Sequence, residues 1–257
     1  MRGHPAVSTR PRALPLVIVP GMSRTSHKPI KQSLPRVLAS LALAAAFLGL
    51  QASQTLLHAP SASAAAVPRA GTEYVQLASP LHVPPRQVVE VFYYDCPHSY
   101  QLETPLDEWA ARQSPPVTVL RIPAAWSDRP DMLAYARLYY TLDKLGIAQQ
   151  EALAVFHAVR DEHQDLTTED AAAEWAAGQG IDTTAFQNAY RLPEVWNETQ
   201  AAPALRERYQ VEQMPTVVVG GRYLTSPFLA DGGVSGTVPV VDYLFQKSAE
   251  RAAAPRW

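Results

Sequence analysis

The side chains most capable of chemistry in this chain lie in one four-residue segment, Cys96-Pro97-His98-Ser99. Cys96 is the only cysteine among 257 residues. It follows a β-rich apolar run from Val88 to Tyr93 and precedes Pro97, a residue favoured at the first position of a helix. Unpaired amide N–H groups and the positive end of the helix dipole stabilise a thiolate at such a position. The pattern therefore predicts a nucleophilic cysteine, although a lone cysteine is more often a small buried apolar residue.

The composition is that of a globular protein with little net charge. Hydrophobic residues make up 47% of the chain, and 22 basic against 24 acidic residues give a formal net charge of -2. Because the basic residues do not gather in a folded patch, we do not expect a nucleic-acid partner. His157 and His163 have no cysteine or carboxylate cluster at ligand spacing beside them, so we expect neither a metal site nor a cofactor.

Residues 1–66 have the features of an export signal. A basic stretch that includes Lys28 and Arg36 precedes an apolar run from Val37 to Leu50, and the small residues from Ser61 to Ala66 could supply a cleavage site. We expect this segment to be cleaved or disordered, with the mature protein starting near Val67 in the periplasm. In an oxidising compartment, a single cysteine indicates a free reactive thiol or pairing with another molecule.

Three alternatives concern the same N-terminal segment. Ala52 is a second candidate for the cleavage position, and Met22 is a candidate start codon. An uncleaved membrane anchor from Val37 to Ala59 is less favoured, because Gln51 and His58 interrupt a stretch that should be mostly apolar for about 20 residues.

The chain after Gly71 alternates between β-rich and helical segments. We expect Thr167 to start one of the helices, and the aromatic side chains of Trp175, Phe186, Tyr190 and Trp196 to lie in the core. The predicted elements up to residue 210 are strands at 74–77, 88–93 and 117–122, a helix from residue 97 that contains Pro105, and helices throughout 128–210. After them we expect a Gly220-Gly221 hairpin between strands at 216–219 and 222–225, a loop at 231–236 and a final helix after Pro239.

These elements resemble the DsbA family of periplasmic thiol:disulfide oxidoreductases from about Val88 to the C-terminus. The segments FYYDCPHSYQLE, RPDMLAYARLYYTLDKLG, GIDTTAF and QMPTVVVGGRY lie in the order expected for that family. The resemblance implies an α/β protein with a thioredoxin fold built from residues 67–127 and 211–257. It also implies an all-helical domain, residues 128–210, inserted between the third strand and the cis-proline hairpin.

The resemblance also implies roles for individual residues. Cys96 matches the attacking cysteine, and Pro97 and His98 match the dipeptide that tunes it, with His98 placed to stabilise the thiolate. Pro215 matches a cis-proline beside the thiol. The expected substrate-binding segment is Met214-Pro215-Thr216, where the Met214 backbone would pair with an extended peptide.

Glu90, on the strand before the cysteine, matches a buried acid beneath the active site of that family. A charged carboxylate there would disfavour the thiolate and could accept a proton from the thiol. The alternative is a solvent-facing residue, because Val89 and Val91 occupy the opposite face of the strand. The run from Val117 to Ile122 carries no lysine to pair with Glu90, where the family often has one.

Ser99 stands where the resembled family has its second cysteine. Disulfide donation needs a stored intramolecular disulfide and resolution needs a second thiolate, and a serine supplies neither. Its hydroxyl could still donate a hydrogen bond to the Cys96 sulfur. We therefore expect a monothiol exchange catalyst, monomeric, whose candidate partners are exported cysteine-containing proteins, glutathione and a membrane redox partner. Two alternatives stay open: a glutathione-binding isomerase or transferase of the same fold, and a non-catalytic peptide-binding or chaperone module.

Overall fold

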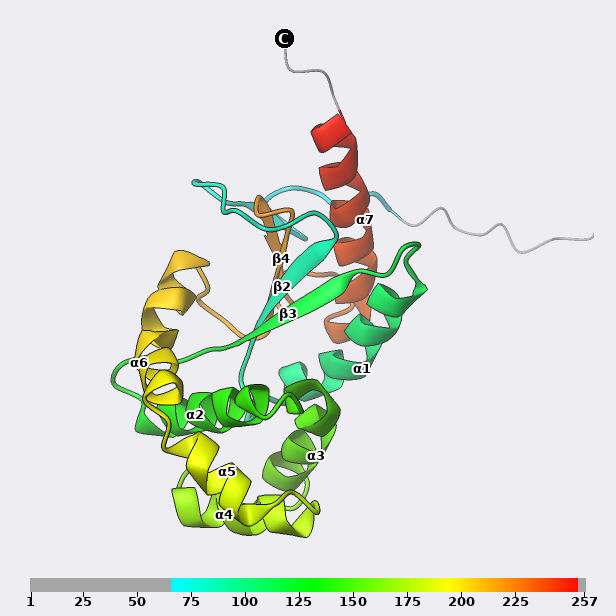
Figure 1. Ribbon diagram of the computed structural model, residues 1–257. Coiled ribbons are helices and arrows are strands. Elements are labelled where there is room, and N and C mark those ends of the chain that lie inside the picture. The colour runs from blue at the N-terminus through cyan, green and yellow to red at the C-terminus, as the bar shows by residue number, and fades with distance from the viewer. Residues whose placement is uncertain (1–65, 254–257) are drawn as a thin grey trace, which may run out of the picture. The chain divides into compact units, whose positions relative to one another are not determined.

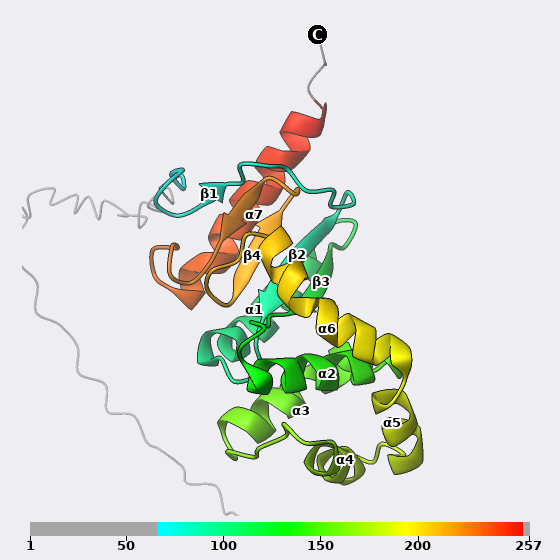
Figure 2. The same ribbon diagram turned by 90° about the vertical axis from the view of Figure 1, so that its left-hand side faces the viewer.

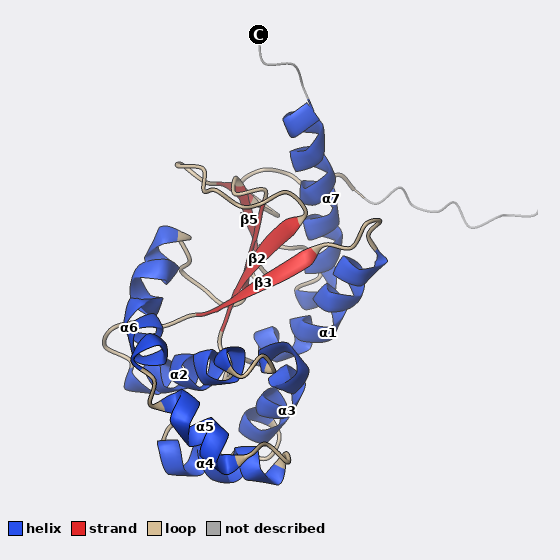
Figure 3. Ribbon diagram, in the orientation of Figure 1, coloured by secondary structure: helices blue, strands red, loops and turns tan. Residues whose placement is uncertain are grey.

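A five-stranded mixed sheet forms the centre of the computed structural model, which describes residues 66–253 (Figures 1 and 3). Strand β2 runs parallel to β3 and antiparallel to β4, and β5 pairs antiparallel with both β4 and β1. The strands, in the spatial order β1-β5-β4-β2-β3, are β1 (Val75–Gln76), β5 (Tyr223–Thr225), β4 (Thr216–Val219), β2 (Gln87–Phe92) and β3 (Thr118–Pro123).

Two long helices, α1 (Pro97–Arg112) and α7 (Val234–Ala253), lie side by side against one face of this sheet (Figures 1 and 2). All the other helices of the described residues come between β3 and β4 in the sequence. They are α2 (Pro130–Lys144), α3 (Ala148–Arg160), α4 (Glu169–Gly178), α5 (Thr183–Tyr190) and α6 (Pro193–Arg208).

Strand β2 is buried on both faces, and its alternating side chains enter two different hydrophobic clusters. Val88 packs with Val217 and Val219 against α1 and α7, whereas Val89 and Val91 point to the opposite face and join the cluster formed with the helices between β3 and β4. Because apolar clusters cover both faces, the central strand has no solvent-facing side.

The structure corrects two sequence-based expectations about the helices. α7 begins at Val234, so Pro239 lies inside the helix and not before it. The N-cap of α4 is Thr168, whose hydroxyl accepts a hydrogen bond from the Ala171 amide. Thr167, the predicted start, instead donates its hydroxyl proton to Asp165. Both errors follow from the cues used: proline is common at the first helical position but is not confined to it, and neighbouring threonines have the same capping chemistry.

Three of the four aromatic residues predicted to lie in the core are buried, but Trp196 is 50% exposed. Its ring lies on the surface of α6, where the Arg137 guanidinium stands 5.4 Å from the ring centre. A cation above an aromatic face is favourable at the surface, so this tryptophan is held without being buried.

The expected export signal, with Met22, Ala52 and most of the small-residue cleavage motif, lies outside the described residues. Among residues 66–253, no helix is both long enough and apolar enough to cross a membrane.

The predicted Gly-Gly hairpin is confirmed, and its second glycine has no room for a side chain. Gly220 and Gly221 have φ angles of 57° and 63°. A Cβ atom on Gly221 would lie 1.9 Å from the Leu81 carbonyl oxygen, because the Leu81 amide donates a 2.7 Å hydrogen bond to the Gly221 carbonyl. The segment before β2 that contains Leu81 is therefore hydrogen-bonded directly to the β4–β5 turn.

We expect Gly221→Ala to lower the free energy of unfolding by at least about 2 kcal/mol, because it adds a steric clash to the cost of a positive φ. Gly146→Ala is the matched control, since Gly146 also has a positive φ of 74° but open space around it. In a urea titration, Gly146→Ala should lower the free energy of unfolding by only about 1 kcal/mol. Equal losses in the two variants would show that the Leu81 contact contributes nothing.

Candidate functional site

Cys96 is held at the point where the chain leaves β2 and enters α1. The helix begins at Pro97, and Cys96 occupies the N-cap with extended backbone angles and no side-chain capping bond. Its thiol is half-buried and donates a 3.3 Å hydrogen bond to the Met214 carbonyl oxygen. As the N-cap residue, Cys96 stands at the end of α1 where the first backbone amides have no partner within the helix.

The segment Met214-Pro215-Thr216 lies beside this sulfur because β4 pairs with β2. In the antiparallel register Thr216 faces Val91, which places the residues before β4 next to the end of β2. The Met214–Pro215 peptide bond is cis, as the resemblance implied. Thr216 donates its hydroxyl proton to the Gln213 carbonyl at 2.7 Å, which ties the turn before β4. The structure therefore brings Cys96 and this segment together across 118 positions of sequence.

His98 contacts an aromatic ring that the sequence analysis did not single out. Its imidazole packs edge-to-face on Phe228, with ring centres 4.9 Å apart and an interplanar angle of 71°. Phe228 is 55% exposed and comes shortly after β5, so an apolar surface lies next to the Cys96 segment. An aromatic residue in the loop after a hairpin gives no periodic signal in the sequence. The stabilising role predicted for His98 toward the thiolate stays a prediction.

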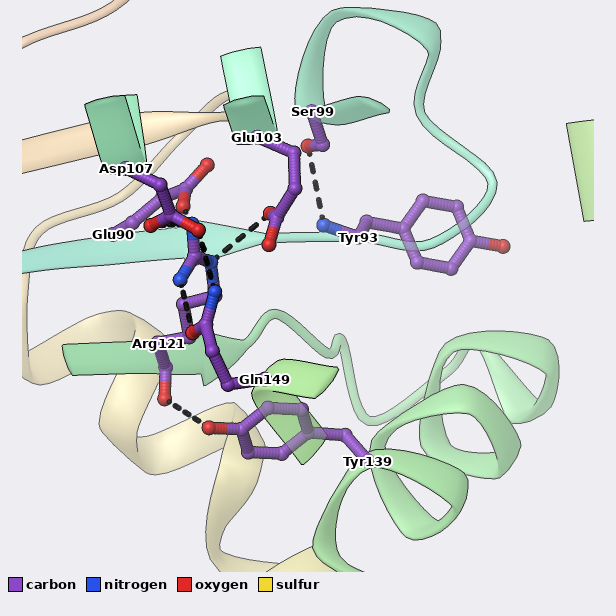
Figure 4. Close-up of polar contacts among 8 residues, drawn as sticks. All are labelled: Glu90, Tyr93, Ser99, Glu103, Asp107, Arg121, Tyr139 and Gln149. Carbon is purple, nitrogen blue, oxygen red and sulfur yellow. Dashed lines mark hydrogen bonds and ion pairs between the residues drawn. The ribbon is translucent and has the colours of Figure 1, made fainter. Parts of the chain in front are cut away.

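Ser99 is fully buried and points inward from the first turn of α1. Its hydroxyl oxygen accepts a 3.3 Å hydrogen bond from the Tyr93 amide at the end of β2 (Figure 4). The hydrogen bond that this hydroxyl could donate to the Cys96 sulfur is not formed among the described residues, and the sulfur instead contacts the Met214 carbonyl oxygen. The serine thus links the helix start to the strand end.

Glu90 is completely buried, so the solvent-facing alternative is wrong. It points to the same face of β2 as Val88, and α1 covers that face. The strand carries no lysine, but Arg121, which the sequence pattern did not single out, lies directly opposite Glu90 in the parallel register. The Arg121 Nε atom is 3.1 Å from a Glu90 oxygen. An arginine inside the otherwise apolar run TVLRIP was the signal available in the sequence.

Arg121 is surrounded by three carboxylates, two of which come from α1 (Figure 4). Glu103 accepts a 3.0 Å hydrogen bond from its Nε atom, and Asp107 accepts one of 2.8 Å from its terminal nitrogen. Gln149 of α3 accepts a further bond of 2.5 Å. Since Glu103 stands four residues after Ser99 on α1, this Arg121 cluster (Glu90, Glu103, Asp107, Arg121 and Gln149) begins one helical turn beyond the serine.

Burial governs the charge of the Arg121 cluster. Loss of solvent raises the pKa of Glu90 and of Glu103, and the Arg121 guanidinium only partly offsets this effect. Burial also opposes the charge on Arg121, but Glu90 and Glu103 outweigh it and raise its pKa. The single Arg121 guanidinium thus forms ion pairs with three acidic side chains. Within residues 66–253, no group of histidine, cysteine or acidic side chains is arranged to hold a metal ion.

Comparisons with known proteins agree with this architecture. Residues 118–238 match a sequence family described as the DSBA-like thioredoxin domain. The thiol:disulfide interchange protein DsbA of Pseudomonas aeruginosa is 35% identical over 190 residues, which cover 73% of this chain and 88% of that protein. The protein of the same name from Burkholderia cepacia is 32% identical over 190 residues, covering 72% and 88% respectively.

Solved structures give the same result. The crystal structure of Pseudomonas aeruginosa DsbA matches with a TM-score of 0.67 at 33% identity, over 73% of this chain and 97% of that one. The oxidoreductase DsbA from Xylella fastidiosa matches with a TM-score of 0.63 at 30% identity, over 73% and 100%. These matches confirm the expected α/β thioredoxin fold with inserted helices. With about a third of the aligned residues identical over most of the relatives' length, the chain belongs to the DsbA family of thiol:disulfide interchange proteins.

Proposed function

We propose that this DsbA-like thiol:disulfide oxidoreductase catalyses disulfide exchange in the periplasm through Cys96 alone. The observation that carries the proposal is the environment of the only cysteine: its sulfur sits at the start of α1 and contacts the Met214 carbonyl. The position three residues later, where a second thiol would be needed for an internal disulfide, is a serine bonded to the Tyr93 amide. The site therefore has an attacking sulfur and no resolving one.

The reaction has two exchange steps. In the first, the Cys96 thiolate attacks one sulfur of a disulfide in a substrate protein or in oxidised glutathione. A bond forms between the two sulfurs, the original disulfide bond breaks, and the other sulfur leaves as a thiolate. In the second step, a thiolate of the substrate or of glutathione attacks the mixed disulfide and displaces Cys96. Each step makes one disulfide and breaks one, so no external oxidant is consumed.

The other residues of the site position the substrate or adjust the sulfur. The backbone of Met214, next to Pro215 and Thr216, receives an extended segment of the substrate beside the sulfur, as an added strand pairs with a sheet edge. Pro97 starts the helix whose positive dipole end lies at Cys96, and the role proposed for His98 is to stabilise the thiolate. The buried Glu90 accepts a proton when the thiol ionises.

Substrates under this proposal are exported proteins that contain cysteines, with glutathione as a small thiol partner and a membrane protein as a further redox partner. We also propose that the protein acts as a monomer. Its thioredoxin-like part would comprise residues 67–127 and 211–257, and its helical insert residues 128–210. A non-catalytic peptide-binding role is the second candidate, favoured by the exposed Phe228 and the half-buried Met214 beside Cys96.

Oxidised glutathione should add once to the protein, at Cys96. Because the helix start favours the thiolate, we expect the adduct to form readily even at about pH 5, where an ordinary cysteine reacts slowly. Intact-mass measurement over time gives the rate, and Cys96→Ser is the control that should gain no mass. Absence of an adduct at any pH up to about 8 would show that the sulfur is not reactive.

Ser99→Cys should convert the site from exchange to disulfide donation. The new thiol would form an internal disulfide with Cys96, so the oxidised variant should oxidise a reduced dithiol peptide in the absence of glutathione at least about tenfold faster than the parent chain. Ser99→Ala is the matched control, since it removes the hydroxyl but adds no sulfur. If the parent chain already matches the cysteine variant, the monothiol mechanism is wrong. Full activity of Cys96→Ala in cells would instead support the non-catalytic role.

A further inference from the structure

Arg160, the last residue of α3, holds the residue that precedes the cysteine. One of its terminal nitrogens donates a 3.2 Å hydrogen bond to the Asp95 carbonyl oxygen and also forms an ion pair with the Asp95 carboxylate. The Cys96 amide belongs to the same peptide group as that carbonyl, and it donates a 3.0 Å hydrogen bond to the Tyr93 carbonyl oxygen. Both polar atoms of the peptide group that joins Asp95 to Cys96 are therefore bonded, and the guanidinium lies against the backbone next to the cysteine.

The end of α3 that carries Arg160 is packed against the start of α1. The ring of Tyr100 stacks on that of Phe156, with ring centres 5.3 Å apart and an interplanar angle of 7°. The Tyr100 hydroxyl donates a 3.0 Å hydrogen bond to the carboxylate of Asp161. Since these two contacts lie on either side of Arg160 in the sequence, the position of the guanidinium beside Asp95 is set by the packing of α3 on α1.

The charge of Asp95 opposes the chemistry proposed for Cys96. Neighbouring Cα atoms in a chain are only about 3.8 Å apart, so an unpaired carboxylate at Asp95 would disfavour a thiolate at Cys96. The ion pair with Arg160 cancels this negative charge at the residue where it would do most harm. The arginine can thus favour the thiolate without touching the sulfur.

We propose that Arg160 is a positioning residue for the thiol chemistry of Cys96 and that it acts through Asp95. It neutralises the carboxylate beside the cysteine, and its bond to the Asp95 carbonyl keeps the positive charge next to the peptide group of Cys96. The inference rests on the proposed function of Cys96. It assigns a part in that function to one of the inserted helices, α3, which carries none of the residues of the thiol site described above.

Alkylation of the protein by iodoacetamide tests the proposal, because the thiolate is the species that reacts and the chain has no other cysteine. Intact-mass measurement gives the rate at each pH between about 4 and about 9. Arg160→Gln leaves the Asp95 carboxylate unpaired, so the midpoint of the pH–rate curve should rise by at least about half a pH unit. At a pH below the midpoint, this change corresponds to an about threefold lower rate.

Asp95→Asn should move the midpoint in the opposite direction. It removes the carboxylate and leaves the Arg160 guanidinium without a countercharge, so the midpoint should fall by about half a pH unit. The double variant Arg160→Gln/Asp95→Asn lacks both charges and should react within about twofold of the parent chain. Loss of a merely structural contact would instead shift the two single variants in the same direction, and that result would overturn the inference.

The other ionisable groups around Asp95 and Cys96 are the same in every variant. Those that line one pocket with Asp95 are Tyr93, Asp131, Tyr135, His163 and Asp165, and those at the contact of α1 with α3 are His98, Tyr100 and Asp161. Differences between the variants therefore report on Arg160 and Asp95.

Arg191→Gln is the matched control, because Arg191 forms a comparable ion pair with Glu169 elsewhere among the inserted helices and should leave the midpoint unchanged. Salt provides a second readout. The side chains of Arg160 and Asp95 are 31% and 45% exposed, so about 1 M sodium chloride should reduce the shift caused by Arg160→Gln. A parent chain that does not react up to about pH 9 would overturn the proposed function and this inference together. A reactive parent chain whose midpoint is unchanged in Arg160→Gln would overturn this inference alone.

Discussion

The pairing of β2 with its two neighbours is the constraint on which the site depends. On one side, the antiparallel register with β4 places Thr216 opposite Val91 and so brings the Met214 carbonyl to the Cys96 sulfur. On the other side, the parallel register with β3 places Arg121 opposite Glu90. A shift of one of these pairings by one residue would turn side chains to the wrong face and separate the pair that depends on it.

The Arg121 cluster illustrates how a buried charge is tolerated at the base of such a site. Bringing an unpaired guanidinium or carboxylate out of water is costly, and the cost falls only when each charge has a partner. Here α1 supplies Glu103 and Asp107, and β2 supplies Glu90, so Arg121 is fully satisfied while the acids are not. Burial raises the pKa of both Glu90 and Glu103, and it leaves carboxylate oxygens of both residues without a hydrogen-bond partner.

The site has the architecture expected of the family but only one cysteine. The helix start, the cis Met214–Pro215 bond and the buried acid are all in place. Ser99 is integrated into the same framework, since its hydroxyl holds the Tyr93 amide at the junction of β2 and α1. A serine at this position fits the junction between β2 and α1. It does not provide the second thiol that an internal disulfide requires.

Much of this protein could be predicted from local sequence. The β-rich run before Cys96, the helix at Pro97 and the Gly220-Gly221 turn each depend on the conformational preferences of a few neighbouring residues, and the structure has all three. The absence of a second cysteine is likewise a property of the sequence alone.

Tertiary structure decided what no local preference encodes. The burial of Glu90 depends on α1 covering one face of β2, and its partner Arg121 comes from another strand through the parallel register. The inward bond of Ser99 to the Tyr93 amide and the contact of Phe228 with His98 also join segments whose proximity only the folded chain creates. Burial and cross-strand register are set by the packing of distant segments, so the electrostatics of the site could be assigned only after the fold was known.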